Sequence, residues 1–161
     1  MKKFSSGQHR SLGFTIPELI TVIVILGLLA AVAAPRFFDV TAFNQRGSHD
    51  QVIASLRYAQ KEAIAQHGFV CVAFTSSSIT LTTGSSNACG TPLTSPSGGA
   101  YVVQANFSPV PGNFSFDCTG IPRTTGQGTC ADANGVLTSA QTVQVQGAAS
   151  ITVEKETGFV H

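Results

Sequence analysis

Charged side chains are scarce in this chain, and cationic ones are nearly missing from its second half. Only 11% of the 161 residues are charged, and after His67 the sole basic residues are Arg123 and Lys155. A surface so poor in cations attracts phosphate groups only weakly. The composition therefore argues against a nucleic-acid partner.

The sequence also lacks the common catalytic and metal-binding motifs. It contains no H-E-x-x-H pair, no G-x-S-x-G nucleophile turn, no phosphate-binding loop and no C-x-x-C spacing. The downstream histidines, His49, His67 and His161, are far apart in the sequence and do not alternate with the cysteines. We therefore predict a protein that is not an enzyme and that needs no cofactor and no metal.

One long apolar stretch, residues 14–35, dominates the N-terminal part. From Leu19 to Pro35 it carries no charge. As a helix it would be roughly 33 Å long, enough to cross the hydrocarbon core of a bilayer. Basic residues precede it, and no acidic residue does. This charge asymmetry predicts a cytoplasmic N-terminus and an outward location for everything after Pro35.

Three interpretations compete for this stretch. A cleaved secretory signal has an apolar core of about 7–15 residues before a small-x-small cleavage site. The run here is longer, although Ala31-Val32-Ala33 mimics such a site. A single-pass anchor fits the length but leaves Glu18 unexplained, because a charge in a membrane segment costs a few kcal/mol. A capping box would give Glu18 a local role, with Thr15 as N-cap and Pro17 in the first turn.

The third interpretation starts from the hexapeptide Gly13-Phe14-Thr15-Ile16-Pro17-Glu18, which leads directly into the apolar run. It resembles the processing site of type IV prepilins and type II secretion pseudopilins. The resemblance implies that a prepilin peptidase removes the basic leader, residues 1–13, by cutting between Gly13 and Phe14, and that Phe14 is then N-methylated. It also implies an apolar helix that is first a membrane anchor and later a filament core. Pro35 falls where many pilins carry a helix-bending proline.

Glu18 has a physical role in this scheme. Cleavage would create an ammonium group on Phe14, and Glu18 would lie about 6 Å further along the helix. A lone carboxylate and a lone ammonium are each unfavourable in apolar surroundings, but together they compensate. If the pair forms between neighbouring subunits, only one axial offset satisfies both charges. The family assigns this assembly role to the residue that matches Glu18.

Beyond Pro35, the sequence predicts an amphipathic helical extension over residues 36–67. Apolar residues recur at helical spacing from Val52 to Ile64, so this stripe should pack on a following domain. Gly47 is a weak point where the helix could break. Gly68 is the expected C′ residue that ends it.

Residues 68–161 change to serine, threonine, glycine and β-branched residues, which predicts an antiparallel β head. The expected strands cover residues 69–75, 78–83, 101–106, 114–118, 141–146, 151–154 and 158–161. Loops are expected at residues 84–99 and 119–129. A long helix followed by an antiparallel sheet is an α+β fold, in agreement with the type IV pilin fold that the resemblance implies.

All four cysteines lie in this head. Four cysteines allow three pairings, and we favour Cys71–Cys89 with Cys118–Cys130 because both close short sequential loops. Such cross-links suit a small head in an oxidising compartment. Asp117 and Asp132 flank the second loop, where a hydrogen-bonded turn role is favoured over calcium binding.

The order of features resembles the GspH/FimT-type subgroup, and most of all the minor pilin of mannose-sensitive haemagglutinin (MSHA) pili. We therefore expect a minor pilin that takes part in type IV pilus initiation and assembly. Its partners would be other pilins, the prepilin peptidase and the inner-membrane assembly platform. It would be a single-pass inner-membrane protein with a periplasmic head before it enters the pilus. The alternatives are an H-type minor pseudopilin of a type II secretion system and, less favoured, a DNA-binding minor pilin.

Overall fold

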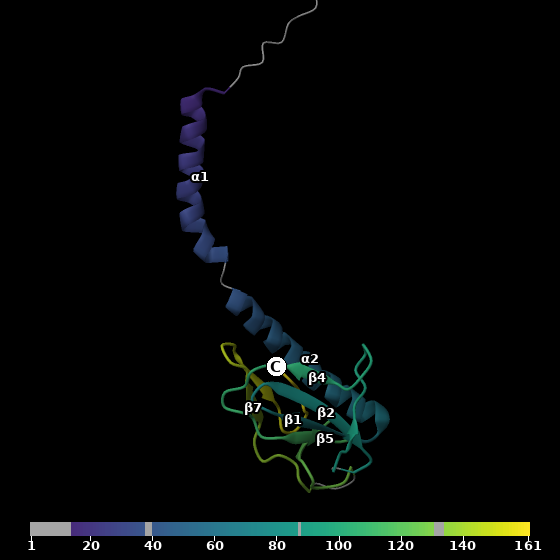
Figure 1. Cartoon of the computed structure of the whole chain (residues 1–161). Coiled ribbons are helices and arrows are strands. Elements are labelled where there is room, and N and C mark those ends of the chain that lie inside the picture. The colour runs from purple at the N-terminus through teal and green to yellow at the C-terminus, as the bar shows by residue number, and fades with distance from the viewer. Residues whose placement is uncertain (1–13, 38–39, 87, 131–133) are drawn as a thin grey trace, which may run out of the picture. The chain divides into compact units, whose positions relative to one another are not determined.

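The computed structural model describes residues 14–37, 40–86, 88–130 and 134–161. The chain divides into two units, residues 1–40 and residues 41–161, each of which is described by itself. The first unit contains helix α1, and the second contains most of helix α2 with all the strands (Figure 1). The predicted leader, residues 1–13, lies outside the described residues.

Helix α1 spans Ile16–Phe37. The carbonyl of Thr15 accepts the first helical bond from the Leu19 N–H at 3.1 Å, so Thr15 is the N-cap that the sequence predicted. The helix continues past Pro35 to Phe37. Residues 16–34 form a segment long and apolar enough to cross a membrane, and none of it is buried within the chain.

Helix α2 spans Val40–Gln66 and runs through Gly47 without interruption, so the break that this glycine could have caused does not occur. The helix buries one stripe of side chains completely: Val52, Ser55, Leu56, Ala59 and Ala63. Their spacing of three and four residues places them on a single face. The predicted apolar stripe is confirmed at Val52, Leu56, Ala59 and Ala63, whereas Ile53 is only partly buried and Ile64 is exposed.

The end of α2 corrects one prediction. His67, rather than Gly68, takes the left-handed conformation, with φ 48°. The His67 N–H donates to Ile64 O at 3.3 Å and the Gly68 N–H to Ala63 O at 3.1 Å, the two bonds of a Schellman motif. Gly68 is thus the C″ residue, and a Cβ there would lie only 3.1 Å from Gly84 O. Position 68 favours glycine because a Cβ there would make a tight contact with the backbone, while His67 carries the positive φ.

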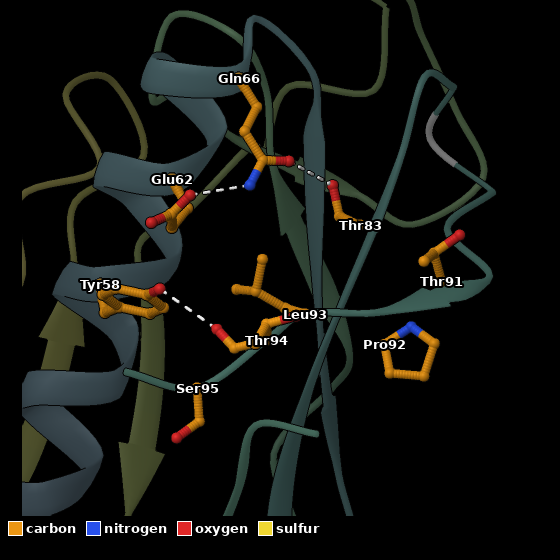
Figure 2. Close-up of a pocket in the computed structure, with 9 residues that line it drawn as sticks. All are labelled: Tyr58, Glu62, Gln66, Thr83, Thr91, Pro92, Leu93, Thr94 and Ser95. Carbon is orange, nitrogen blue, oxygen red and sulfur yellow. Dashed lines mark hydrogen bonds between the residues drawn. The ribbon is translucent and has the colours of Figure 1, made fainter. Parts of the chain in front are cut away.

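The main sheet has the order β3-β2-β1-β5-β6, with β4 paired to β2. The antiparallel hairpin of β1 (Phe69–Phe74) and β2 (Ser78–Gly84) is the predicted one. Strands β4 (Val102–Gln104) and β5 (Phe114–Phe116) are shorter than predicted. Two further strands lie in segments expected to be loops, β3 (Thr91–Pro92) and β6 (Pro122–Thr124). A pocket lies between α2 and the β2–β3 region (Figure 2).

A second, two-stranded sheet pairs β7 (Gln141–Gln144) with β8 (Ser150–Val153). The chain end returns antiparallel to β8 through a bridge between Val153 and Val160. The Thr152 N–H donates to His161 O at 2.7 Å, and the His161 N–H donates to Thr152 O at 3.0 Å. The predicted terminal hairpin is therefore present over these residues.

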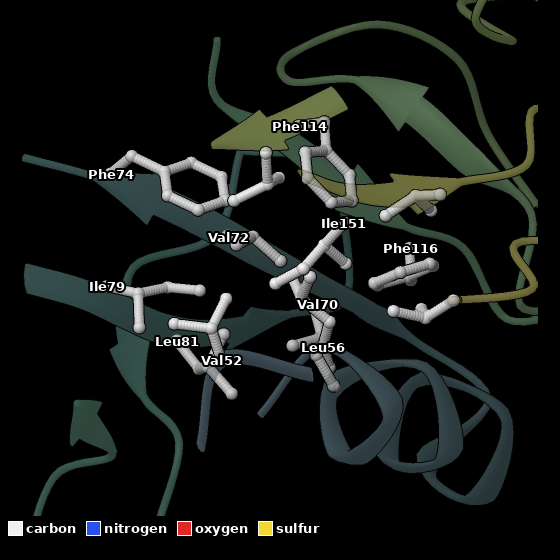
Figure 3. Close-up of a cluster of buried hydrophobic side chains, with 14 of the residues drawn as sticks. Val52, Leu56, Val70, Val72, Phe74, Ile79, Leu81, Phe114, Phe116 and Ile151 are labelled. Carbon is white, nitrogen blue, oxygen red and sulfur yellow. The ribbon is translucent and has the colours of Figure 1, made fainter. Parts of the chain in front are cut away.

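One hydrophobic core joins α2 to both sheets (Figure 3). Val52 and Leu56 from α2 pack with Val70 and Val72 from β1, and Ile151 contributes from β8. Aromatic contacts extend the core, with the Phe74 ring 5.3 Å from Phe107 and 6.1 Å from Phe114. The α+β fold, an apolar helix followed by a helix packed on antiparallel strands, matches the type IV pilin fold.

Candidate assembly site

Glu18 lies in the first turn of α1 and is the only charged residue between Ile16 and Ala34. Its side chain is exposed, and no side-chain hydrogen bond or ion pair of Glu18 occurs within the described residues. The capping-box bond from Glu18 back to the N-cap is therefore not formed. A carboxylate in the first turn interacts favourably with the helix dipole. Within the described residues, its hydrogen-bonding capacity is therefore not used.

The other predicted processing and assembly residues fall as follows. Phe14 precedes the first turn of α1, and its side chain is 79% exposed. Pro35 lies within α1, two residues before the helix ends. Gly13 lies outside the described residues. The structure thus describes the residue on one side of the predicted cleavage site, together with the carboxylate four positions later.

The head carries two disulfides. Cys71, in the middle of β1, is joined to Cys89, with Cα atoms 5.9 Å apart. Cys118, directly after β5, is joined to Cys130, with Cα atoms 5.7 Å apart. These are the two pairs favoured from the sequence. The first ties the central hairpin to the segment before β3, and the second closes the β5–β6 hairpin and the loop after it.

A buried ion pair, which the sequence analysis missed, lies beside the second disulfide. The Arg123 Nε donates to Asp117 Oδ2 at 2.6 Å, and the two side chains are 4% and 0% exposed. Asp117 Oδ1 accepts from the Thr119 N–H at 2.8 Å, the Thr119 hydroxyl at 2.6 Å and the Ile121 N–H at 3.0 Å. Arg123 Nη1 donates to Asn134 O at 2.6 Å. The pair therefore holds the β5–β6 turn and the chain that follows Cys130.

The environment of Asp117 sets its charge state. Burial by itself would raise the pKa of the Asp117 carboxyl, but the Thr119 hydroxyl, Arg123 and the Ile121 and Thr119 N–H groups all stabilise the anion. Their combined effect lowers the pKa of Asp117 below its ordinary value of 3.8. Asp117 is thus an ionised turn residue, the role that the sequence favoured over calcium binding. Asp132 lies outside the described residues.

Polar side chains of α2 fasten the β5–β6 turn and the chain end to the helix. The Gln60 Nε2 donates to Gly120 O at 3.0 Å and to Thr157 O at 2.9 Å. The Arg57 Nη2 donates to Val160 O at 2.9 Å. Arg57 is an exposed residue whose guanidinium nevertheless binds within its own chain. Gly120 has φ +83°, a backbone conformation that favours glycine.

The described part of the chain offers no cluster of metal-binding side chains. Across residues 14–37, 40–86, 88–130 and 134–161, no three histidine, cysteine, aspartate or glutamate side chains gather as a metal site would require. Both pairs of cysteines are consumed in disulfides. The chemistry that the described residues offer is an unpaired carboxylate on an apolar helix and a cross-linked head.

Comparison with known proteins gives relatives that match part of the chain. The chain is 44% identical over 57 residues, 35% of its length, to the type IV narrow pilus major component PilA5 of Thermus thermophilus. It is 39% identical over 54 residues, 34% of its length, to a fimbrial protein of Pseudomonas aeruginosa. The chain is type IV pilin-like. No family model matches this pilin-like chain, and no solved structure does.

The similarity is confined to part of each protein. The aligned residues cover 49% of the Thermus relative and 35% of the Pseudomonas relative. The comparisons therefore support a type IV pilin-like chain, since its relatives are a type IV pilus component and a fimbrial protein. They do not distinguish major from minor pilins.

Proposed function

We propose that this chain is a minor pilin that is processed between Gly13 and Phe14, N-methylated on Phe14, and incorporated into a type IV pilus through α1. One observation carries the proposal. Glu18 is a carboxylate without a partner among the described residues, at the start of a helix whose segment Ile16–Ala34 carries no other charge and is not buried within its own chain. Such a helix needs an external apolar environment, and such a carboxylate needs an external cation.

The two requirements have a common solution. A bilayer satisfies the apolar surface of α1 before assembly, and neighbouring copies of the same kind of helix satisfy it afterwards. The new amine of Phe14 on an adjacent subunit would supply the cation for Glu18. Because an unpaired charge in an apolar environment costs a few kcal/mol, only the subunit offset that forms this pair is stable.

The assignment to a minor pilin of the MSHA type, rather than a major pilin, rests on the sequence resemblance to the GspH/FimT-type subgroup. An H-type minor pseudopilin of a type II secretion system would use the same fold, processing and Glu18 chemistry, and is the alternative. A DNA-binding pilin is disfavoured because the head offers few cations: Arg123 is buried in its ion pair, and Arg57 binds Val160 O. In each case the chain would begin in the inner membrane with its head in the periplasm.

Processing is tested by mass spectrometry of the chain from cells with and without the prepilin peptidase. We expect the mature chain to begin with N-methylated Phe14 only when the peptidase is present. An intact Gly13–Phe14 bond in peptidase-containing cells would refute the proposal.

Assembly is tested with Glu18→Gln, compared with Glu156→Gln as a control that removes an exposed carboxylate from the head. We expect Glu18→Gln to be processed but to be lost from sheared filaments by at least about tenfold, because a lost charge pair of a few kcal/mol changes an equilibrium by that factor or more. The control should assemble normally. Equal incorporation of both variants would contradict the assembly role of Glu18.

The type of machine is tested by deleting the gene. A minor pilin predicts fewer pili at an unchanged level of the major subunit, whereas a pseudopilin predicts a secretion defect with normal piliation. A gel shift with duplex DNA tests the remaining alternative, and we expect no salt-dependent shift.

A further inference from the structure

A groove on the head, separate from α1, has the chemistry of a ligand site. It lies between α2 and the β2–β3 region and encloses about 450 Å³ (Figure 2). This volume falls within the range of small-molecule sites, which is about 300–1,000 Å³. A second pocket of about 390 Å³ adjoins it, and Ser95 lines both. The two pockets are therefore neighbours on the head.

The groove combines an apolar strip with two polar edges. Figure 2 shows Tyr58, Leu93 and Pro92 across its middle, with Glu62, Gln66 and Thr83 along one edge and Thr94 and Ser95 along the other. Tyr101, which lines the second pocket, stacks on Tyr58 with ring centroids 5.1 Å apart, so it covers one face of the Tyr58 ring. The remaining surface of Tyr58 belongs to the groove.

Hydrogen bonds fix the polar edges in place. The Tyr58 hydroxyl donates to Thr94 O at 3.3 Å. The Gln66 Nε2 donates to Glu62 Oε2 at 2.7 Å, and the Thr83 hydroxyl donates to Gln66 Oε1 at 3.1 Å. The proximity of Glu62 also contributes, after burial, to raising the pKa of Tyr58. These bonds pre-organise the site, which reduces the entropy lost when a ligand binds.

The charge of the groove restricts the ligand. None of the described residues that line either pocket is lysine, arginine or histidine, and Glu62 is the only charged one. Among the described residues Glu62 has no cationic partner, so it can accept further hydrogen bonds. An anionic ligand would be repelled. A ligand that places hydroxyl donors on Glu62 and an apolar face on Tyr58 and Pro92 satisfies the site.

We propose that this groove binds a neutral oligosaccharide. A pyranose ring has a C–H face that packs on an aromatic ring and a rim of hydroxyls that donate to carboxylate and carbonyl oxygens. The two adjoining pockets accommodate more than one such ring. Binding at this site is independent of α1, of processing and of the kind of filament that the chain enters.

The test uses the full chain in a zwitterionic detergent, because detergents with sugar head groups would compete. Neutral tetrasaccharides of glucose, mannose and N-acetylglucosamine are titrated by calorimetry, with a sulfated oligosaccharide and a tetralysine peptide as further probes. We expect at least one neutral tetrasaccharide to bind with a Kd below about 1 mM. We expect Glu62→Gln to weaken this binding by at least about tenfold, because hydrogen bonds to a charged group are the stronger ones.

The control is Glu156→Gln, an equally conservative change of an exposed carboxylate that does not line the groove. Glu156→Gln should bind the sugar like the wild type. Glu62→Gln and Glu156→Gln should both keep the wild-type melting temperature. Tyr58→Leu provides a second variant and should also weaken binding. Absence of binding by all neutral probes, tighter binding of tetralysine or of the sulfated sugar, or sugar binding that both groove variants retain would each overturn the proposal.

Discussion

Replacing Asp117 by asparagine tests the main electrostatic element of the head. The substitution keeps the size of the side chain but removes the charge that Arg123 needs. Arg123 would remain 4% exposed, with its Nε donor facing an amide that can itself be a donor. Breaking a buried pair by removing one partner costs about 3–5 kcal/mol. Because a typical domain is stable by only about 5–15 kcal/mol, we expect a large loss.

The assay is thermal unfolding of the oxidised full chain at neutral pH, monitored by circular dichroism in the near ultraviolet. A loss of this size should lower the melting temperature by about 10–20 °C. Glu156→Gln is the matched control, since Glu156 is exposed and lies 3.9 Å from Lys155. Surface ion pairs of this kind contribute about 0–1 kcal/mol, so the control should melt near the wild-type temperature.

A double variant separates the ion pair from the loss of Asp117 as a turn residue. Asp117→Asn combined with Arg123→Met removes both members of the ion pair, so the guanidinium no longer has to stay buried without the Asp117 carboxylate. We expect the double variant to be more stable than Asp117→Asn alone, although Asn134 O loses the bond from Arg123. Two results would refute the reasoning. One is a loss of unfolding free energy below about 1 kcal/mol for Asp117→Asn. The other is a double variant whose loss equals the sum of the losses measured for Asp117→Asn and Arg123→Met separately.

Three further predictions follow from the head. Because the pKa of Asp117 is lowered in the fold, its ionised carboxylate stabilises the fold at pH values above the ordinary pKa of 3.8. This stabilisation is lost as the pH falls through the lower pKa of the folded state. Acid should therefore destabilise the wild type more steeply below about pH 4 than it destabilises Asp117→Asn. His67→Gly should raise the free energy of unfolding by about 1 kcal/mol because glycine accepts the positive φ, whereas Gly68→Ala should lower it. Urea unfolding measures both changes. A destabilised His67→Gly would contradict the Schellman assignment. Leu56→Ala should lower stability by about 2–5 kcal/mol in the same assay, and Ile64→Ala, at a position 43% exposed, by much less; equal losses would contradict the placement of the core.

The sequence predicted those parts of the fold whose signal is local. The apolar run that became α1, the buried stripe from Val52 to Ala63 and the β1–β2 hairpin all follow from periodicity and turn residues within a short window. The two cysteine pairings could be favoured from loop length alone. The unpaired Glu18 was visible because it interrupts a run with no other charge.

The sequence predicted less well where an element depends on a distant partner. Strands β3 and β6 are very short, and each is a strand because it pairs with a neighbour in the fold, β2 or β5. Their own residues carry no strand pattern, so both were expected to be loops. Strand length likewise depends on the neighbouring strand, which is why β4 and β5 are shorter than their residue patterns indicated.

By itself, then, the sequence determined that the N-terminal part contains a long apolar helix. It also determined that one face of α2 and a set of strands bury their apolar residues together, because burial of apolar surface follows local periodicity. Only the tertiary structure decided that Arg123 is buried rather than solvated. Arginine is normally exposed, and its burial becomes favourable here because the β5–β6 turn places the carboxylate of Asp117 2.6 Å from Arg123 Nε. The groove beside Tyr58 likewise exists only because folding brings α2 and the β2–β3 region together.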